Sequence, residues 1–157
     1  MAYSLFVDLD RCIGCYACEV ACKQEHGLPV GPRWIRVVRD GPRETEGGLT
    51  LDFHPRMCKH CEEPMCAEVC PEQAISKGTS GLVTIDPGLC TGCGACVEGC
   101  PFGLMAFDRE AGKASKCDLC GERIARGLEP SCVACCPGKA LLFSKEPAQG
   151  RRTVRLV

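Results

Sequence analysis

Short runs of alternating or apolar residues, separated by glycine-rich turns, predict several brief β-strands along the chain. The glycine-rich stretch 41–48 is expected to connect one strand pair, and Gly78-Thr79-Ser80-Gly81 is a hairpin signal for another. The pattern therefore favours small strand pairs over one large sheet. The predicted strands lie at 3–8, 34–38, 49–53, 74–75, 82–85, 104–107 and 113–116.

The helical segments are expected to be equally short. Helices are predicted at 16–25, 95–99 and 118–126, with Gly127 ending the last one. The first two begin beside a cysteine, and a short helix is expected at the equivalent place in each of the cysteine quartets described below. Short helices mixed with short strands place the chain in the α+β class.

The composition leaves little material for a conventional hydrophobic core. The chain has 157 residues, enough for one domain or two small ones, and 5% of them are aromatic. It also has 17 cysteines. Groups bound by these cysteines would supply the missing interior.

The charge and the chain ends narrow the range of partners. A formal net charge of −1 argues against a strongly basic surface for nucleic acid. The locally positive segment Arg151-Arg152-Thr153-Val154-Arg155 is expected to be a solvated tail. No signal-peptide pattern is visible, and no apolar run approaches the ~18 residues of a membrane span. We therefore expect a soluble, cytoplasmic protein with no direct membrane span.

Sixteen of the 17 cysteines fall into four quartets, and the last three quartets are each followed by proline. Two residues between successive cysteines let a tight loop present several thiolates to one cluster, and Gly14, Gly92 and Gly94 allow the backbone to approach closely. This spacing is typical of [4Fe–4S] sites. The quartets are Cys12-Cys15-Cys18-Cys22, Cys58-Cys61-Cys66-Cys70, Cys90-Cys93-Cys96-Cys100 and Cys117-Cys120-Cys132-Cys136.

Other uses of cysteine fit this pattern poorly. The odd number of cysteines and their tight spacing argue against a disulfide scaffold. A four-cysteine zinc site is built from two separated pairs, whereas the first and third quartets read CxxCxxCxxxC. Iron-sulfur clusters are the favoured interpretation, and a zinc-stapled interaction module is the structural alternative.

The quartets form an internal repeat. The first and third match as CIGCYACEVAC and CTGCGACVEGC. In every quartet the fourth cysteine lies one helical turn, ~5.4 Å, beyond the third, so it tends to point at a different cluster, as in two-cluster ferredoxins. We favour a nested exchange, in which quartets two and three share ligands and one and four do the same. The tandem exchange of one with two and three with four is the alternative.

With four quartets in this order, the chain resembles the four-cluster ferredoxin-like subunits of the dimethyl sulfoxide reductase family of molybdopterin enzymes. The resemblance covers residues 3 to about 143 and is carried by CIGCYACEVACK, CKHCEEPMCAEVCP, CTGCGACVEGCPFG and KCDLCGERIARGLEPSCVACCP. It implies four [4Fe–4S] clusters with the nested exchange. We expect two ferredoxin-like halves, one made of residues 1–56 with 104–157 and the other of residues 57–103.

The resemblance also implies a ligand set for each cluster. Cluster 1 takes Cys12, Cys15, Cys18 and Cys136, and cluster 2 takes Cys117, Cys120, Cys132 and Cys22. Cluster 3 takes Cys58, Cys61, Cys66 and Cys100, and cluster 4 takes Cys90, Cys93, Cys96 and Cys70.

What the resemblance implies for function is a non-catalytic subunit of an oxidoreductase complex. It would relay single electrons between a molybdenum- or tungsten-pterin catalytic subunit and a redox partner, such as a flavin subunit, a quinone subunit or a ferredoxin. The C-terminal extension by which longer members dock to a membrane anchor is missing, so the compact subunits that accompany tungsten aldehyde oxidoreductases are the nearer comparison.

Three alternatives to this function stay open. They are a freestanding polyferredoxin, a subunit of a hydrogenase or formate dehydrogenase, and a homo-oligomer stacked head to tail. No phosphate-binding loop, dinucleotide fingerprint or nucleophile–base pair indicates catalysis by the chain itself, so no catalytic residue is predicted.

Several other residues near the quartets have a functional and a structural interpretation. Cys135, the seventeenth cysteine, is expected to be a small buried apolar residue. His60 either donates a hydrogen bond that raises the potential of its cluster or simply packs. His26 and His54 are expected on the surface, and Trp34 in the core or an interface.

Three lysines flank cluster cysteines. A cation at such a position would stabilise an anionic cluster, or it would simply be solvated. The lysines are Lys23, Lys59 and Lys116.

Overall fold

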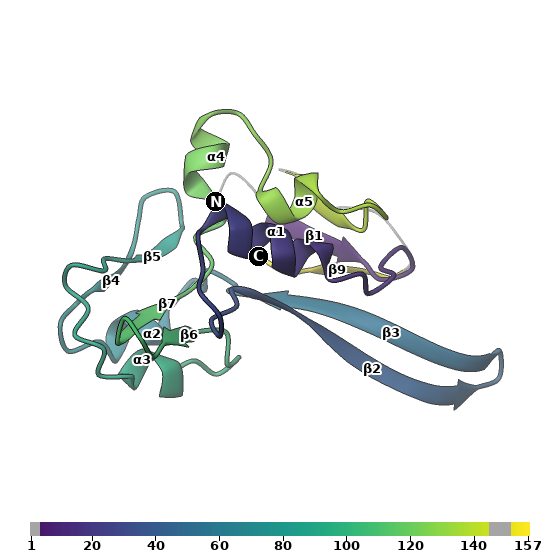
Figure 1. Ribbon diagram of the computed structural model, residues 1–157, viewed down its shortest axis with the longest axis horizontal. Coiled ribbons are helices and arrows are strands. Elements are labelled where there is room, and N and C mark those ends of the chain that lie inside the picture. Colours follow the sequence, from purple (N-terminus) through teal and green to yellow (C-terminus); the bar gives the residue numbers. More distant parts are fainter. Residues whose placement is uncertain (1–3, 145–151) are drawn as a thin grey trace.

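The computed structural model describes residues 4–144 and 152–157 and shows two lobes with a long hairpin beside them (Figure 1). Each lobe has its own cluster of buried side chains, and cysteines occur in both clusters. The lobe around the first cluster, which includes Leu5 and Val133, is called the large lobe, and the lobe around the second, which includes Ile75 and Val83, is called the small lobe. The second buried cluster includes Met105 and Ala114, which lie beyond residue 103, so the small lobe's core continues past the predicted boundary.

A three-stranded antiparallel sheet of order β8-β1-β9 forms the centre of the large lobe. It consists of β1 (Ser4–Asp8), β8 (Leu141–Ser144) and β9 (Thr153–Arg155). Leu5 and Val7 of β1 are almost completely buried. Of these three strands only β1 is predicted from the sequence pattern, because β8 and β9 pair with a strand at the other end of the chain and have no partner across a nearby turn.

The described part of the expected solvated tail is largely exposed, but it forms a strand. Residues 153–155 pair with β1, and Arg152 forms ion pairs with Asp10 at 3.3 Å and Asp52 at 2.8 Å. The first ion pair ties this segment to the residues after β1, and the second ties it to the long hairpin. Arg151 lies outside the described residues.

Three short helices complete the large lobe. They are α1 (Ala17–Glu25), α4 (Gly121–Ala125) and α5 (Ser131–Ala134). α1 packs on α5, and the buried side chains of both helices include cysteines. The predicted helix 118–126 is shorter in the structure, because the residues around Leu119 and Cys120 adopt positive φ angles that an α-helix cannot contain.

The hairpin of β2 (Ile35–Thr45) and β3 (Gly48–Met57) runs beside the large lobe, and its tip extends beyond it (Figure 1). It is longer than predicted, since stretch 41–48 forms strand rather than connection except at its tight turn. A register shift between Asp40 and Arg43 accommodates the glycine and proline there. Near the base, the buried Glu19 of α1 accepts the Val37 N–H at 2.6 Å, whereas most of the outer hairpin is exposed.

The small lobe contains two hairpins and two single-turn helices. The hairpins are β4 (Ile75–Lys77) with β5 (Val83–Ile85), and β6 (Ala106–Asp108) with β7 (Lys113–Ser115). The helices are α2 (Met65–Glu68) and α3 (Ala95–Glu98). Both predicted hairpins and the helix near residue 95 are confirmed here.

The mixture of short helices and strands in the two lobes fits a ferredoxin-like arrangement. Contacts between the lobes include two hydrogen bonds: the Trp34 indole donates to Ser115 Oγ of β7 at 2.9 Å, and the Arg36 guanidinium donates to the Gly103 carbonyl. Among the described residues, no helix has the length and hydropathy that crossing a membrane would require.

Candidate iron-sulfur cluster sites

The structure gathers the sixteen quartet cysteines into four groups, each with three cysteines of one quartet and one of another. Three groups each line a cavity, and the largest of these, around the group for cluster 3, has a volume of about 270 Å³. The groups are numbered by the cluster proposed for them. The cavities contain Cys12, Cys15, Cys18 and Cys136 (group 1); Cys58, Cys61, Cys66 and Cys100 (group 3); and Cys70, Cys90, Cys93 and Cys96 (group 4). The remaining group, Cys22, Cys117, Cys120 and Cys132 (group 2), is close enough for its thiols to interact electrostatically.

This grouping is the one that the nested exchange predicts. The ligand assignments themselves stay predictions, since proximity of thiols is not coordination.

Burial makes several of these thiols hard to ionise without a cation. Mainly through burial, the pKa is raised to about 12 for Cys18, to about 11 for Cys96 and to about 12 for Cys117, and neighbouring cysteines contribute to each rise. Cys22 and Cys132 shift in the same direction for the same reason. Four converging thiolates would repel one another unless metal ions compensate their charge, so the donor set fits iron-sulfur clusters.

Backbone N–H groups already point at several of the sulfurs. Leu104 N–H donates to Cys100 Sγ at 3.4 Å, and Ala140 N–H donates to Cys136 Sγ at 3.3 Å. The two bonds are equivalent in the repeat, because each comes from the residue four positions after the last cysteine of a quartet. Such bonds favour the thiolate and help set the potential of a bound cluster.

The glycines in the first and third quartets act through conformation and packing. Gly14 and Gly92 have φ angles of +65° and +76°, which disfavour other residues. A Cβ at Gly14 would lie 2.4 Å from the Phe53 ring, and one at Gly92 would lie 1.9 Å from the Gly112 carbonyl oxygen. Both positions therefore require glycine for loop packing, besides any approach to a cluster.

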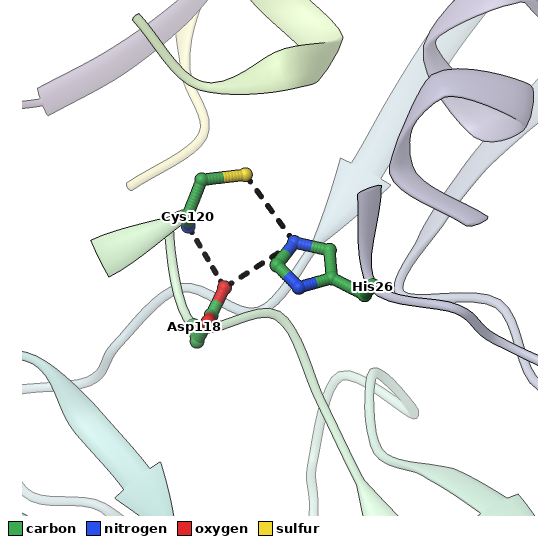
Figure 2. A group of neighbouring side chains, drawn as sticks. All are labelled: His26, Asp118 and Cys120. Atoms are coloured by element: carbon green, nitrogen blue, oxygen red, sulfur yellow. Dashed lines mark hydrogen bonds and ion pairs between the residues drawn. The ribbon is translucent and has the colours of Figure 1, made fainter. Parts of the chain in front are cut away.

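His26 is not a surface side chain, contrary to the prediction. Its side chain is 14% exposed, and Nε2 lies 3.3 Å from Cys120 Sγ and 3.6 Å from Asp118 Oδ1 (Figure 2). The ring also packs on Trp34, with 4.4 Å between centroids. His26 follows Cys18 and Cys22 at intervals of four, so helical spacing was the signal that could have placed it on the same face of α1.

The contact changes the acidity of both partners. Burial lowers the pKa of His26, but the bond to Cys120 and the Asp118 charge outweigh it and raise the pKa overall. Burial raises the pKa of Cys120, but the bonds with His26 and Ser131 bring it below the ordinary value. Cys120 is thus the cysteine of its group best prepared to be a thiolate.

The three lysines that flank quartet cysteines differ in burial and in their partners. Lys116 is 4% exposed and donates to the carbonyls of Val83 and Cys117, whereas Lys59 is exposed and lies over the Phe102 ring. Lys23 donates to the carbonyls of Pro29 and Pro32 in the loop after α1.

His60 is buried in the small lobe. Its Nδ1 accepts the Val83 N–H at 3.0 Å. Burial and the nearby Lys116 charge lower its pKa to about 3, so the ring is neutral at pH 7. His54 is partly exposed, with Nε2 3.7 Å from Asp40 Oδ2. The prediction of a core or interface position for Trp34 is confirmed, because the indole packs against the large lobe's buried cluster.

Cys135 is exposed rather than buried, so that prediction is wrong. Its thiol lies 3.4 Å from the Ala17 carbonyl, while the next residue, Cys136, lines the cavity of group 1. The physical reason is that Cys135 ends the single turn of α5, and successive positions on a helical turn face different directions.

Shared helices and one close pair arrange the four groups in a row. α1 carries Cys18 of group 1 and Cys22 of group 2. Cys117 of group 2 interacts electrostatically with Cys58 of group 3. In the small lobe, α2 packs on α3. α2 contains Cys66 of group 3 and is followed by Cys70 of group 4, whereas α3 contains Cys96 of group 4 and is followed by Cys100 of group 3.

Comparison with known proteins agrees with the cysteine pattern. Residues 49–146 and residues 11–74 each match a family described as a 4Fe-4S dicluster domain.

Curated relatives cover most of this chain. The B subunit of tetrathionate reductase from Salmonella typhimurium is 38% identical over 92% of this chain and 59% of its own length. The thiosulfate reductase electron transfer subunit PhsB of Salmonella typhi is 39% identical over 91% of this chain and 76% of its own. The B component of anaerobic dimethyl sulfoxide reductase from Escherichia coli is 37% identical over 90% and 72%. This chain thus spans about three fifths to three quarters of their lengths.

Proposed function

The protein belongs to the 4Fe-4S dicluster family of iron-sulfur reductase subunits, and from this membership we propose that it relays single electrons between a catalytic subunit and a redox partner. The observation that carries the proposal is the gathering of sixteen cysteines into four groups in a row. One group of cysteines would hold a single redox centre, whereas four groups in a row would form a path for electrons.

The proposed ligands are the four sets given above, with clusters 1 to 4 in that order along the path. When bound, each [4Fe–4S] cluster supplies a one-electron redox site. The chain's own contribution is to hold four thiolates per site, to aim N–H groups at sulfur and to keep water from the buried groups. Cys15 and Cys93 are the exposed cysteines of groups 1 and 4, so electrons would enter and leave at the two ends of the row.

The proposed catalytic partner is a molybdenum- or tungsten-pterin subunit. Relatives are named as the B components of tetrathionate, dimethyl sulfoxide and polysulfide reductases, which supports assembly with a larger catalytic polypeptide. A flavin subunit or a ferredoxin is the proposed partner at the other end. This chain is proposed to have no catalytic activity of its own.

Metal analysis of the chain purified anaerobically from its native cells tests the proposal. Four cubes predict about 16 iron atoms per chain. Co-purified molybdenum or tungsten would identify the class of catalytic partner, and nickel would indicate a hydrogenase complex instead. Iron without a second metal favours a freestanding carrier, and zinc without iron contradicts the proposal.

A further inference from the structure

Lys116 lies at the junction between the sites proposed for clusters 2 and 3. It lines the same cavity as Cys58, Cys61, Cys66 and Cys100, and its neighbour in sequence is Cys117 of group 2. Its ammonium donates to the carbonyl of Cys117 at 2.9 Å and to the carbonyl of Val83. The side chain therefore reaches from one group of cysteines to the next.

The positive charge of Lys116 is buried without a carboxylate partner. None of the ion pairs among residues 4–144 and 152–157 includes it, and the two carbonyl groups solvate the ammonium without neutralising it. A buried charge is costly unless an opposite charge lies nearby. Glu63 lines the same cavity, but it is exposed and forms no ion pair with Lys116, which leaves the surrounding thiolates to supply that charge.

Lys116 lies beside proposed ligands on both sides of the junction. It lines the same cavity as Cys66 of group 3 and donates to the carbonyl of Cys117 of group 2. One ammonium thus lies near ligands proposed for two different clusters.

The residues around Lys116 fix its position. Val83 of β5 is almost completely buried, its carbonyl accepts from Lys116, and its N–H donates to His60. The Val83 backbone is thus held at both its N–H and its carbonyl, which keeps the acceptor for the Lys116 ammonium in place.

We propose that Lys116 is a shared countercharge that raises the midpoint potentials of clusters 2 and 3. The inference rests on the proposed function, because it requires clusters in these groups. Reduction adds one negative charge to a cluster, and a fixed buried cation nearby stabilises the reduced form, since screening by solvent is weak there. Lys116 would thereby ease the transfer of an electron across the junction between the lobes.

Lys59 provides a matched control within the same site. It carries the same charge and lines the same cavity next to Cys58, but its side chain is exposed. Solvent and salt should screen it, so its loss should change the potentials little.

The test measures iron per chain and all four midpoint potentials, by redox titration followed with electron paramagnetic resonance on the anaerobically purified holoprotein. In Lys116→Met we expect two of the four potentials to fall, with a loss of about tenfold in the reduction equilibrium constant, or 59 mV for one electron. In Lys59→Met we expect less than about a twofold change. Unchanged potentials in an iron-replete Lys116→Met protein would overturn this inference and leave the proposed function standing.

Lys116→Arg decides the case in which Lys116→Met loses iron. If the charge matters, the arginine variant should keep its iron and its potentials, and loss of iron confined to the uncharged variant supports the inference. Loss of iron in both variants would show a requirement for lysine packing and overturn it. A wild-type chain without about 16 irons would overturn the proposed function, and this inference with it.

Discussion

The two lobes hold their cysteines in different ways. In the large lobe five of the eight quartet cysteines are buried, namely Cys18, Cys22, Cys117, Cys120 and Cys132, whereas in the small lobe only Cys96 is. The large lobe also has a three-stranded sheet with fully buried Leu5 and Val7, while the small lobe has two separate hairpins. The large lobe can therefore bury apolar side chains without a cofactor, and the small lobe depends more on what its cysteines bind.

Removal of the metal should produce the largest difference in stability between the two lobes. After iron is chelated, we expect amide protection in β4, β5, β6 and β7 to be lost, because few apolar side chains remain to hold these hairpins. Amides of β1 and β8 should keep part of their protection. Hydrogen exchange followed by mass spectrometry on the iron-loaded and iron-free chain measures this, and equal protection in the two lobes would contradict the comparison.

A cavity in the large lobe should cost more than a change on the hairpin. Leu5→Ala removes a side chain that is 0% exposed and should lower the free energy of unfolding by about 2–5 kcal/mol. Leu49→Ala, at a position that is 76% exposed, should stay within about 0.5 kcal/mol. Anaerobic urea unfolding of both variants checks the difference, and similar midpoints would show that Leu5 is not part of a stabilising core.

Removal of the imidazole at residue 26 should affect one site in the large lobe. His26→Phe preserves a ring beside Trp34 but loses the contact with Cys120, so we expect one of the four midpoint potentials to fall. A neutral hydrogen bond corresponds to about 1 kcal/mol. His54→Phe is the control, because His54 lies on the hairpin and pairs there with the exposed Asp40. Equal changes in both variants would exclude a specific role for His26.

The smallest expected effect concerns the attachment of the hairpin to the C-terminal strand. Hydrogen bonds and charges from Arg152 and Arg43 lower the pKa of Asp52 below its ordinary value of 3.8. Because the folded pKa is the lower one, the stabilisation is fully present above 3.8 and is lost as the pH falls through the folded pKa.

Asp52→Asn should therefore weaken protection of the β9 amides to the same extent at pH 5 and pH 7. Protection factors from hydrogen exchange at the two pH values test this. If the difference between wild type and variant disappears at pH 5, the stabilisation does not come from an Asp52 carboxylate with a lowered pKa.

The sequence was most informative where local spacing decides the structure. The quartets, the short helices beside them and the small-lobe hairpins all depend on residues close in sequence. The direction of each fourth cysteine indicated only that quartets exchange ligands. The preference for the nested over the tandem exchange came from the short distance between quartets two and three, and the full ligand sets came from the family resemblance. β8 and β9 were missed because they pair with β1 at the opposite end of the chain, whereas the equally short strands of the small lobe each have a partner just across a turn.

The chemistry around the cysteines was harder to foresee. The contact between His26 and Cys120 joins residues 94 positions apart, and the burial of Lys116 depends on Val83 of another hairpin. Lys59 and Lys116 each stand beside a quartet cysteine in sequence, yet one is exposed and the other buried. Such differences arise from tertiary packing, which spacing along the chain does not encode.

The pairing of β1 with β8 and β9 has a consequence for biosynthesis. As the chain leaves the ribosome, β1 emerges long before its partners, which begin at residues 141 and 153. All eight cysteines of the small-lobe groups are translated by residue 100, well before those partners. The nascent small lobe can therefore fold before β1 has a strand to pair with, and β1 is among the last strands to be paired.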